Sequence, residues 1–315
     1  MTNISLIIPF YNEIENGTFL FTELKSFIER NRALTFEVIL IDDGSEDQSF
    51  EFFSNQFNSF PGIVKIIKLS KNFGSHSAVR AGLIHANSEY CVFVSADLQD
   101  PLELVIELYN EAKKGFEIVF ASRNNLPTTF FERIFSSIYS YLMKKYVNKS
   151  YPKLGFDTVL FSSKIKENLN LNIESNSSIQ LQILHLGFKQ SFITYEKKVR
   201  KNGKSKWSTA KKIKLFIDSF VAFSYVPIRF VTILGVILFF SGLIFTCILF
   251  FRKLILNDLV SGWTMLISIL CIGFGVTNIS LGIIAEYLWR TFDASRNRPV
   301  FVIDEVVEFN TQKTH

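Results

Sequence analysis

The sequence predicts an α/β domain with a mostly parallel sheet, followed by an interfacial amphipathic helix and two transmembrane helices. Three observations predict this organisation: short apolar strands alternate with helical stretches, polar clusters follow the strands, and two long uncharged runs lie near the C-terminus. Alternating strands and helices indicate a parallel sheet, whose ligands bind beyond the carboxyl ends of the strands.

Five apolar stretches are expected to form strands: 4–8, 36–41, 64–69, 90–95 and 118–121. Apolar residues recur at helical spacing in 18–30, 48–58, 77–86, 102–114 and 130–146, which predicts helices there. Polar clusters follow the strands at Asn12-Glu13, Asp42-Asp43-Gly44-Ser45, 97–101 and Ser122-Arg123. We therefore expect these clusters at one edge of the sheet.

Residues 230–251 carry no charge, and neither do residues 262–285. Each run exceeds the roughly 20 residues that cross a bilayer core, so each is predicted to span a membrane. Lysine and arginine gather before the first run (Lys197, Lys198, Arg200, Lys201, Lys204, Lys206, Lys211, Lys212, Lys214, Arg229) and after the second (Arg290, Arg296, Arg298). The positive-inside rule therefore predicts a multi-pass protein with its α/β domain and both termini in the cytoplasm.

The expected divisions are a cytoplasmic domain at 1–206, a juxtamembrane region at 207–229, two spans within 230–289 and a cytoplasmic tail at 290–315. Basic and apolar residues alternate at helical spacing in 207–224, as in helices that lie in the membrane interface. The residues before Pro9 lack a basic leader, so they predict a strand and not a signal peptide.

The formal charge of +5 is modest, and the basic residues gather beside the predicted spans. This pattern favours membrane lipid or a phosphorylated substrate over nucleic acid as the partner. The cysteines Cys91, Cys247 and Cys271 lack the spacing of metal ligands.

Carboxylates cluster after two of the predicted strands, at Asp42 and Asp43 and at Asp97 and Asp100. Such carboxylates repel one another unless a hard cation or a donor-rich ligand lies between them. A nucleoside diphosphate with Mg²⁺ or Mn²⁺ meets that need, since these ions take one or two carboxylates together with phosphate oxygens. The alternative for either cluster alone is a turn or a helix cap.

Several motifs together resemble a known family: Ile8-Pro9-Phe10-Tyr11-Asn12-Glu13, Ile41-Asp42-Asp43-Gly44-Ser45, Ser95-Ala96-Asp97-Leu98-Gln99-Asp100-Pro101 and Ser122-Arg123. They look like the successive signatures of family 2 glycosyltransferases with the GT-A fold. The stretch Arg200 to Trp207, the stretch Tyr225-Val226-Pro227-Ile228-Arg229 and the two predicted spans are similar to those of polyprenyl-phosphate glycosyltransferases. The two-span architecture favours the bactoprenol glucosyltransferase branch over the dolichol-phosphate mannose synthases.

The resemblance implies roles for particular residues. Nucleotide binding is expected of Pro9, Tyr11, Glu13, Asp42, Asp43 and Asp97, and metal binding of Asp97 and Gln99. The acceptor phosphate would be bound by Arg123, Arg133, Ser137, Arg200 and Lys206. The catalytic set is then Asp97, Arg123 and Arg200.

Two features bear on the donor site. Ser95 departs from the family, which usually has aspartate there, and a neutral hydroxyl is a weaker metal ligand. His76 could touch the donor or simply begin a helix, and helix starts favour polar residues.

The resemblance implies that one sugar moves from a nucleotide sugar, such as UDP-glucose, to polyprenyl (undecaprenyl) phosphate, with inversion at the anomeric carbon. The expected location is the bacterial inner membrane, and a homotetramer is expected from the family alone. The sequence allows two roles for Asp157: it orients the acceptor or it caps a loop. A processive polysaccharide synthase and a noncatalytic nucleotide-binding scaffold remain as alternatives.

Overall fold

The computed structural model describes residues 2–124, 130–152, 155–173, 178–196, 224, 226–256, 262–296 and 298–310. The chain forms two compact units. One comprises Met1–Ser219 with Pro299–His315, and the other comprises Phe220–Arg298.

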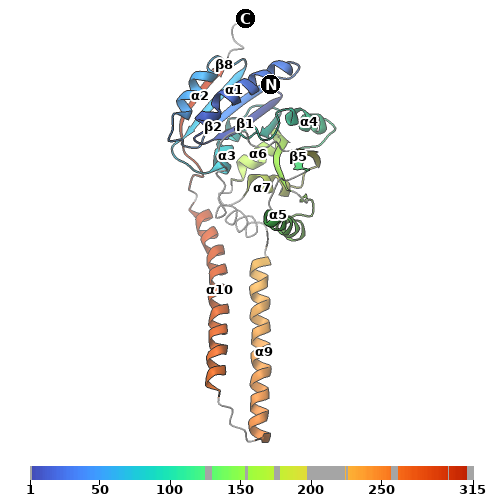
Figure 1. Cartoon of the computed structure of the whole chain (residues 1–315), viewed down its shortest axis with the longest axis vertical. Helices are drawn as coiled ribbons and strands as arrows, with labels where there is room; N and C mark the ends of the chain where they lie inside the picture. The colour runs from blue at the N-terminus through green and yellow to red at the C-terminus, as the bar shows by residue number, and fades with distance from the viewer. Residues whose placement is uncertain are drawn as a thin grey trace. The chain divides into compact units, whose positions relative to one another are not determined.

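The first unit is built on an eight-stranded sheet in the order β7-β5-β6-β4-β1-β2-β3-β8 (Figure 1). Its strands are β1 (Ile4–Phe10), β2 (Phe36–Asp42), β3 (Ile63–Leu69), β4 (Tyr90–Phe93), β5 (Ile118–Arg123), β6 (Phe156–Ser162), β7 (Gln190–Tyr195) and β8 (Ile303–Asn310). Four of the seven strand pairs are parallel, while β6 and β8 run antiparallel to their neighbours. The predicted α/β domain with a mostly parallel sheet is confirmed.

Helices cover both faces of this sheet. The first unit contains α1 (Ile14–Arg30), α2 (Ser49–Phe57), α3 (Ser75–His85), α4 (Glu103–Ala112), α5 (Phe130–Leu142), α6 (Ser163–Leu171) and α7 (Ile179–His185). Helices α1, α2 and α4 pack on one face, where alternate strand residues such as Ile4, Leu6 and Ile8 join the core. Helix α3 packs on the other face, where Gly82 meets the side chains of Ile7 and Ile41. Because both faces are covered, the central strands are apolar along nearly their whole length.

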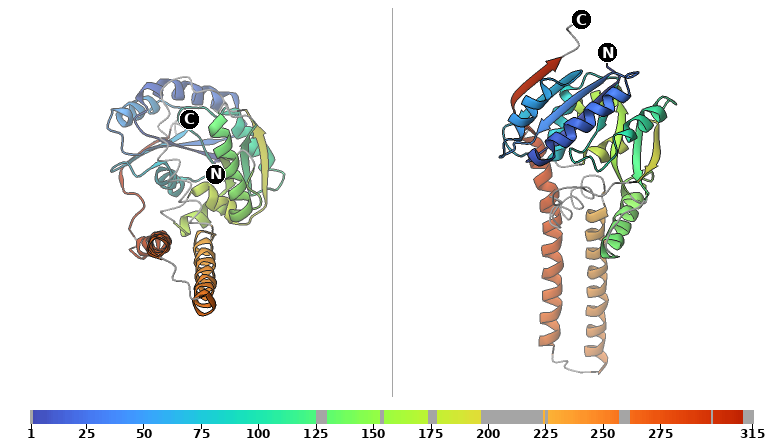
Figure 2. Two further views of the ribbon diagram at one scale, coloured as in Figure 1. Left: turned by 60° about the horizontal axis from the view of Figure 1, so that its bottom comes forward. Right: turned by 45° about the horizontal axis from the view of Figure 1, so that its top comes forward.

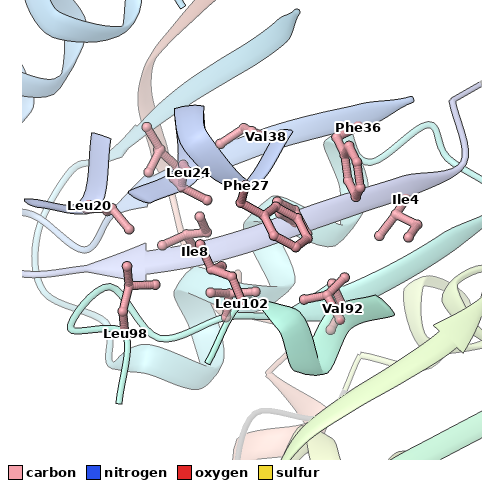
Figure 3. Close-up of a cluster of buried hydrophobic side chains, with 14 of the residues drawn as sticks. Ile4, Ile8, Leu20, Leu24, Phe27, Phe36, Val38, Val92, Leu98 and Leu102 are labelled. Atoms are coloured by element: carbon pink, nitrogen blue, oxygen red, sulfur yellow. The ribbon is translucent and has the colours of Figure 1, made fainter. Parts of the chain in front are cut away.

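The main core lies between the sheet and the first of these helical layers. Figure 3 shows Ile8 of β1 among Leu20 and Leu24 of α1 and Leu98 and Leu102 from the segment after β4. The loop that carries Asp97 is therefore attached to the core by its apolar residues.

The five predicted strands and the helices of the first 146 residues are confirmed, with their ends shifted by a few residues. Helix α1 starts at Ile14, earlier than predicted, and α5 continues as one π-helical turn at Met143–Val147. The amphipathic helix expected at 207–224 lies outside the described residues, apart from Ser224.

The C-terminal segment corrects the predicted division of the chain. Residues 290–315 were expected to be a tail, yet β8 lies within them and pairs with β3 along the edge of the sheet. Figure 2 shows this red strand beside the blue strands of the first unit. Alternating apolar residues such as Val307 and Phe309 turn towards the core, which is the period-2 pattern of an edge strand.

The second unit contains two long helices, α9 (Val226–Leu256) and α10 (Trp263–Ser295), which contact each other. Within α10, residues Ile272–Asp293 are long and apolar enough to cross a membrane. The apolar stretch of α9 found among the described residues, Arg229–Gly242, is shorter than a span. One of the two predicted spans is thus supported by length and composition, and the other stays a prediction.

Candidate active site

The site residues come from loops at one edge of the sheet. Strand β1 lies between β2 and β4 and is parallel to each, so the loops after these strands meet at a common carboxyl edge. Strand β6 runs antiparallel to β4 and β5, so β5 points the same way as β4. The ends of β5 and β7 and the start of β6 therefore lie along this edge too.

The loop after β1 is tied to the loop after β2 through Asn12. Its backbone N–H donates to Ser45 Oγ at 2.9 Å, and its Oδ1 accepts from the backbone N–H of Glu46 at 2.9 Å. The backbone N–H of Glu13 donates to Ser49 Oγ at 3.0 Å. These bonds hold Tyr11 and Glu13, two of the expected nucleotide-binding residues, partly exposed beside the Asp-Asp turn.

Asp43 supports a third loop. Its Oδ1 accepts from the backbone N–H of Phe73 at 2.8 Å, and its Oδ2 accepts from that of Gly74 at 3.0 Å. Burial raises the pKa of Asp43 to about 6, against the opposing effect of these two hydrogen bonds. The backbone N–H of Gly74 also lies 3.2 Å from Oδ1, so the remaining capacity of Asp43 to accept from a ligand is on Oδ2.

Asp42 is fully buried, and its Oδ1 caps the turn by accepting from the backbone N–H of Ser45 at 2.9 Å. Burial raises its pKa, although the hydrogen bonds from Ser45 oppose the shift. The structure thus gives Asp42 a turn-forming part, and its expected contact with nucleotide stays a prediction.

Gly44 brings the loops after β2 and β3 into direct backbone contact. Its φ is +66°, and a Cβ at this position would lie 2.3 Å from the backbone carbonyl carbon of Lys71. A glycine is required here both for the left-handed backbone and for the close approach.

The turn after β4 has a different character. Leu98 adopts a φ of 47° although it is a bulky residue, while its side chain stays buried in the core. Such a conformation costs of order 1–3 kcal/mol and is held by the surrounding packing. Among the described residues only Asn12 shares this non-glycine positive φ, so strain concentrates in two loops of this edge.

Asp97 and Gln99 flank Leu98 and are partly exposed, and the backbone N–H of Gln99 donates to Asp97 Oδ1 at 3.3 Å. Ser95 Oγ is buried with no hydrogen-bond partner in the described part of the chain. Across the described ranges, no group of three or more His, Cys, Asp or Glu could hold a metal ion. The oxygens of Asp97 and Gln99 fit an ion that takes one carboxylate from the protein and completes its shell with diphosphate oxygens.

Asp100 belongs to a buried polar network that sequence reasoning missed. Its Oδ2 accepts from Thr158 Oγ1 at 2.8 Å, and its Oδ1 accepts from the Tyr195 hydroxyl at 2.6 Å. That hydroxyl also lies 3.3 Å from Asp157 Oδ2. Burial, followed by the charges of Asp157 and Asp100, raises the pKa of Tyr195, so its hydroxyl stays protonated. The spacing of these residues gave no signal, because the network joins strands far apart in sequence.

Arg123 is held at the end of β5 by a bidentate ion pair of its Nε and Nη2 with the carboxylate of Asp157. Burial lowers its pKa and Asp157 raises it, and the net shift is upwards, so the guanidinium remains charged. Arginine has five N–H donors, so donors beyond those two remain for an anion. Asp157 therefore orients Arg123.

The remaining candidates are distributed as follows. Ser137 is exposed on α5, and Arg133 lies one turn earlier on this helix, its side chain outside the described set. Arg200 and Lys206 lie outside the described residues. His76 lies in the first turn of α3, as expected of a helix-start residue, and burial lowers its pKa to about 4.

Comparison with known proteins identifies the family. The model of Glycosyl transferase family 2 matches residues 5–167, which is more than half of the chain. The chain belongs to glycosyltransferase family 2. Its α/β fold is of the GT-A type, and the three carboxylate-bearing loops lie within the family match.

Three curated relatives of this glycosyltransferase cover nearly its whole length. The putative glycosyltransferase CsbB of Bacillus subtilis is 31% identical over 96% of this chain and 91% of its own. The undecaprenyl-phosphate 4-deoxy-4-formamido-L-arabinose transferase of Photorhabdus laumondii is 28% identical over 98% of this chain and 95% of its own. The prophage bactoprenol glucosyl transferase homolog of Escherichia coli is 28% identical over 96% of this chain and 99% of its own.

Proposed function

We propose that this glycosyltransferase transfers one sugar from a nucleoside-diphosphate sugar to polyprenyl phosphate at the cytoplasmic face of a bacterial membrane. The observation that carries the proposal is the turn after β4, which leaves Asp97 and Gln99 partly exposed at the same edge of the sheet as the loops after β1 and β2. Full-length similarity to two relatives named for undecaprenyl phosphate and bactoprenol supports a lipid phosphate as acceptor.

On the donor side, Pro9, Tyr11, Glu13 and Asp43 would bind the base and ribose from the loops after β1 and β2. Asp97 and Gln99 would hold Mg²⁺ or Mn²⁺ on the diphosphate, with the Ser95 hydroxyl or a water completing the shell. When bound, such an ion neutralises the negative charge that builds on the departing nucleoside diphosphate.

On the acceptor side, Arg123 is charged and oriented by Asp157 at the same edge of the sheet. Arg133, Ser137, Arg200 and Lys206 would complete the phosphate site. A phosphate monoester is largely dianionic at neutral pH, since its second pKa is about 6. The acceptor therefore needs little help from a general base.

The proposed reaction is a single displacement. A phosphate oxygen of the lipid attacks the anomeric carbon, the bond from that carbon to the diphosphate oxygen breaks, and the electron pair leaves with the nucleoside diphosphate. The configuration inverts because attack and departure occur on opposite faces. Holding donor and acceptor in line would supply much of the catalysis.

The sheet supports two membrane crossings. Strands β1 to β7 precede α9 and α10 in the chain, whereas β8 follows them and pairs with β3 in the same sheet. A segment that leaves a folded unit and returns to it crosses a bilayer an even number of times. If α10 spans, as Ile272–Asp293 allows, the return to the sheet requires a second crossing; we assign that crossing to α9, which puts both termini on one side. The basic residues on both sides of the pair favour the cytoplasmic side.

The test is transfer by the full-length protein in detergent with undecaprenyl phosphate, Mn²⁺ or Mg²⁺, and a panel of UDP- and GDP-sugars. Label should enter the organic phase from one donor, and a chelator should abolish the transfer. Asp97→Ala should lower the rate at least about a hundredfold through loss of metal-assisted charge neutralisation. Asp304→Ala, an exposed carboxylate on β8, is the matched control. Retained nucleotide binding without transfer from any donor would contradict the proposal.

A further inference from the structure

Helix α5 and the π-helical turn after it carry an exposed stripe of apolar and basic side chains. The α5 stripe consists of Ser137, Ile138, Tyr141, Lys144, Lys145 and Tyr146. Ile138, Tyr141 and Tyr146 are 50%, 60% and 38% exposed. Figure 1 shows α5, in dark green, at the margin of the first unit.

The opposite side of this segment is fixed to the unit. Met143 is fully buried and Ser140 is 5% exposed, and the ring of Tyr139 lies 6.1 Å from that of Tyr151. The exposed stripe is therefore presented on an anchored helix, and its three large side chains Ile138, Tyr141 and Tyr146 remain 38–60% exposed. A surface of this kind marks an interaction site.

Basic residues predominate in the sequence around the stripe. Between Glu132, near the start of α5, and Asp157, which pairs with Arg123, the chain has no aspartate or glutamate but contains Arg133, Lys144, Lys145, Lys149 and Lys153. Lys145 Nζ lies 5.5 Å from the ring centroid of Tyr141 and 5.1 Å from that of Tyr146. Tyrosine hydroxyls and lysine ammonium groups above apolar side chains are the composition of a surface that sits at a membrane interface.

We propose that the α5 stripe docks the catalytic unit on the surface of an anionic bilayer. The Ile138 side chain and the rings of Tyr141 and Tyr146 would enter the headgroup region, and Lys144 and Lys145 would meet lipid phosphates. Ser137, expected to bind the acceptor phosphate, lies in this stripe one turn before Tyr141. Docking therefore sets the level at which a lipid phosphate meets the site; this last step rests on the proposed function, whereas docking itself does not.

A bilayer fits the stripe better than a second copy of the chain. In a two-fold contact the same patch faces itself, so the lysines of one copy would meet those of the other. Like charges brought together in an interface oppose association. An anionic lipid surface instead complements the local charge, and each lysine near such a surface contributes favourably.

Quenching by lipid tests docking without any need for turnover. Full-length protein with its three tryptophans replaced by phenylalanine receives Tyr141→Trp and is placed in phosphatidylglycerol nanodiscs with brominated acyl chains. The control is Glu29→Trp, which is exposed in the last turn of α1 and so at the amino edge of the sheet. Bromolipid should quench position 141 and not position 29. Equal emission at both sites would overturn the proposal.

A kinetic experiment links docking to the site. The double variant Lys144→Glu/Lys145→Glu should raise KM for polyprenyl phosphate in anionic nanodiscs about twentyfold, since each lysine near an anionic surface counts for about fivefold. KM for the nucleotide sugar should stay unchanged. Lys25→Glu/Lys114→Glu, two exposed lysines on or beside other helices, makes the same charge change and should leave both constants unaltered. An unchanged lipid KM in the first variant would contradict the link, and the quenching result stands whether or not transfer occurs.

Discussion

The turn after β2 and the turn after β4 both carry two aspartates, yet the protein uses them differently. In the first, Asp42 caps its own turn and Asp43 supports the loop before α3, so most of their hydrogen-bonding capacity is directed inwards. In the second, Asp100 is directed inwards while Asp97 and Gln99 remain partly exposed around a strained leucine. The first turn therefore builds the edge of the sheet, and the second leaves the oxygens of Asp97 and Gln99 for the proposed metal and diphosphate.

Replacing Gly44 by alanine should have the largest effect on stability and would test whether the first turn is structural. A Cβ there meets the backbone of Lys71, and the positive φ adds strain, so unfolding free energy should fall by about 3 kcal/mol. The control is Gly187→Ala, where φ is +73° but nothing lies within 4 Å. Chemical denaturation measures both, and equal losses would show that close approach is irrelevant.

Removing the hydroxyl of Tyr195 should have the next largest effect on stability. It would test whether Asp100, the buried aspartate of the turn after β4, has a structural role. Tyr195→Phe leaves the buried Asp100 carboxylate without one donor, which should cost about 1–3 kcal/mol of unfolding free energy. Tyr90→Phe is the control, because Tyr90 is also a largely buried tyrosine and its hydroxyl makes no hydrogen bond among the described residues. A smaller loss for Tyr195→Phe than for Tyr90→Phe would argue against the network.

Ser95→Asp would test whether the turn after β4, with its partly exposed Asp97 and Gln99, binds a metal ion. A carboxylate there should bind Mn²⁺ about ten- to hundredfold more tightly in the presence of nucleoside diphosphate, because ligand charge sets the affinity for hard cations. Without metal the variant should melt lower than the parent, since the new carboxylate replaces a buried hydroxyl. Electron paramagnetic resonance of Mn²⁺ measures the affinity. A large gain of transfer from an inactive parent would instead support the noncatalytic scaffold.

The smallest expected effect is a pH dependence of nucleotide binding through the carboxylate of Asp43. The pKa of Asp43 in the folded protein is about 6, above the ordinary 3.8. Protonated Asp43 therefore stabilises the folded state, and this stabilisation is lost as pH rises through 6. Nucleotide hydrogen-bonded to the carboxylate needs the opposite form. Affinity for UDP or GDP should therefore fall about tenfold from pH 7 to pH 5, as one protonation requires.

Asp43→Asn should flatten that pH profile, which isothermal titration calorimetry can follow. Asp47→Asn is a control on the same loop, whose carboxylate accepts from the backbone N–H of Ser49. An unchanged slope in Asp43→Asn would assign the titration to another group.

Local patterns in the sequence predicted the central strands and helices, because buried parallel strands read as apolar runs bounded by polar turns. They also predicted that Asp43 and Asp97 lie at the same edge of the sheet, since the carboxyl ends of parallel strands share one side. They did not predict β8, although its alternating residues are typical of an edge strand. An edge strand after two apolar helices finds its partner only through a long-range contact, and the sequence carries no sign of that partner.

Tertiary structure alone decided which polar side chains pair with other side chains of the protein and which can still bind a ligand. Arg123 and Asp157, 34 residues apart, form their ion pair because β5 and β6 are antiparallel neighbours. Tyr195 reaches Asp100 because β7 joins β5 at the same edge. The sequence by itself determined the family motifs, the order of strands and helices and the apolar C-terminal runs, since these depend on neighbouring residues. The division of labour between the two aspartate turns depends on strand pairing, and pairing exists only in the folded sheet.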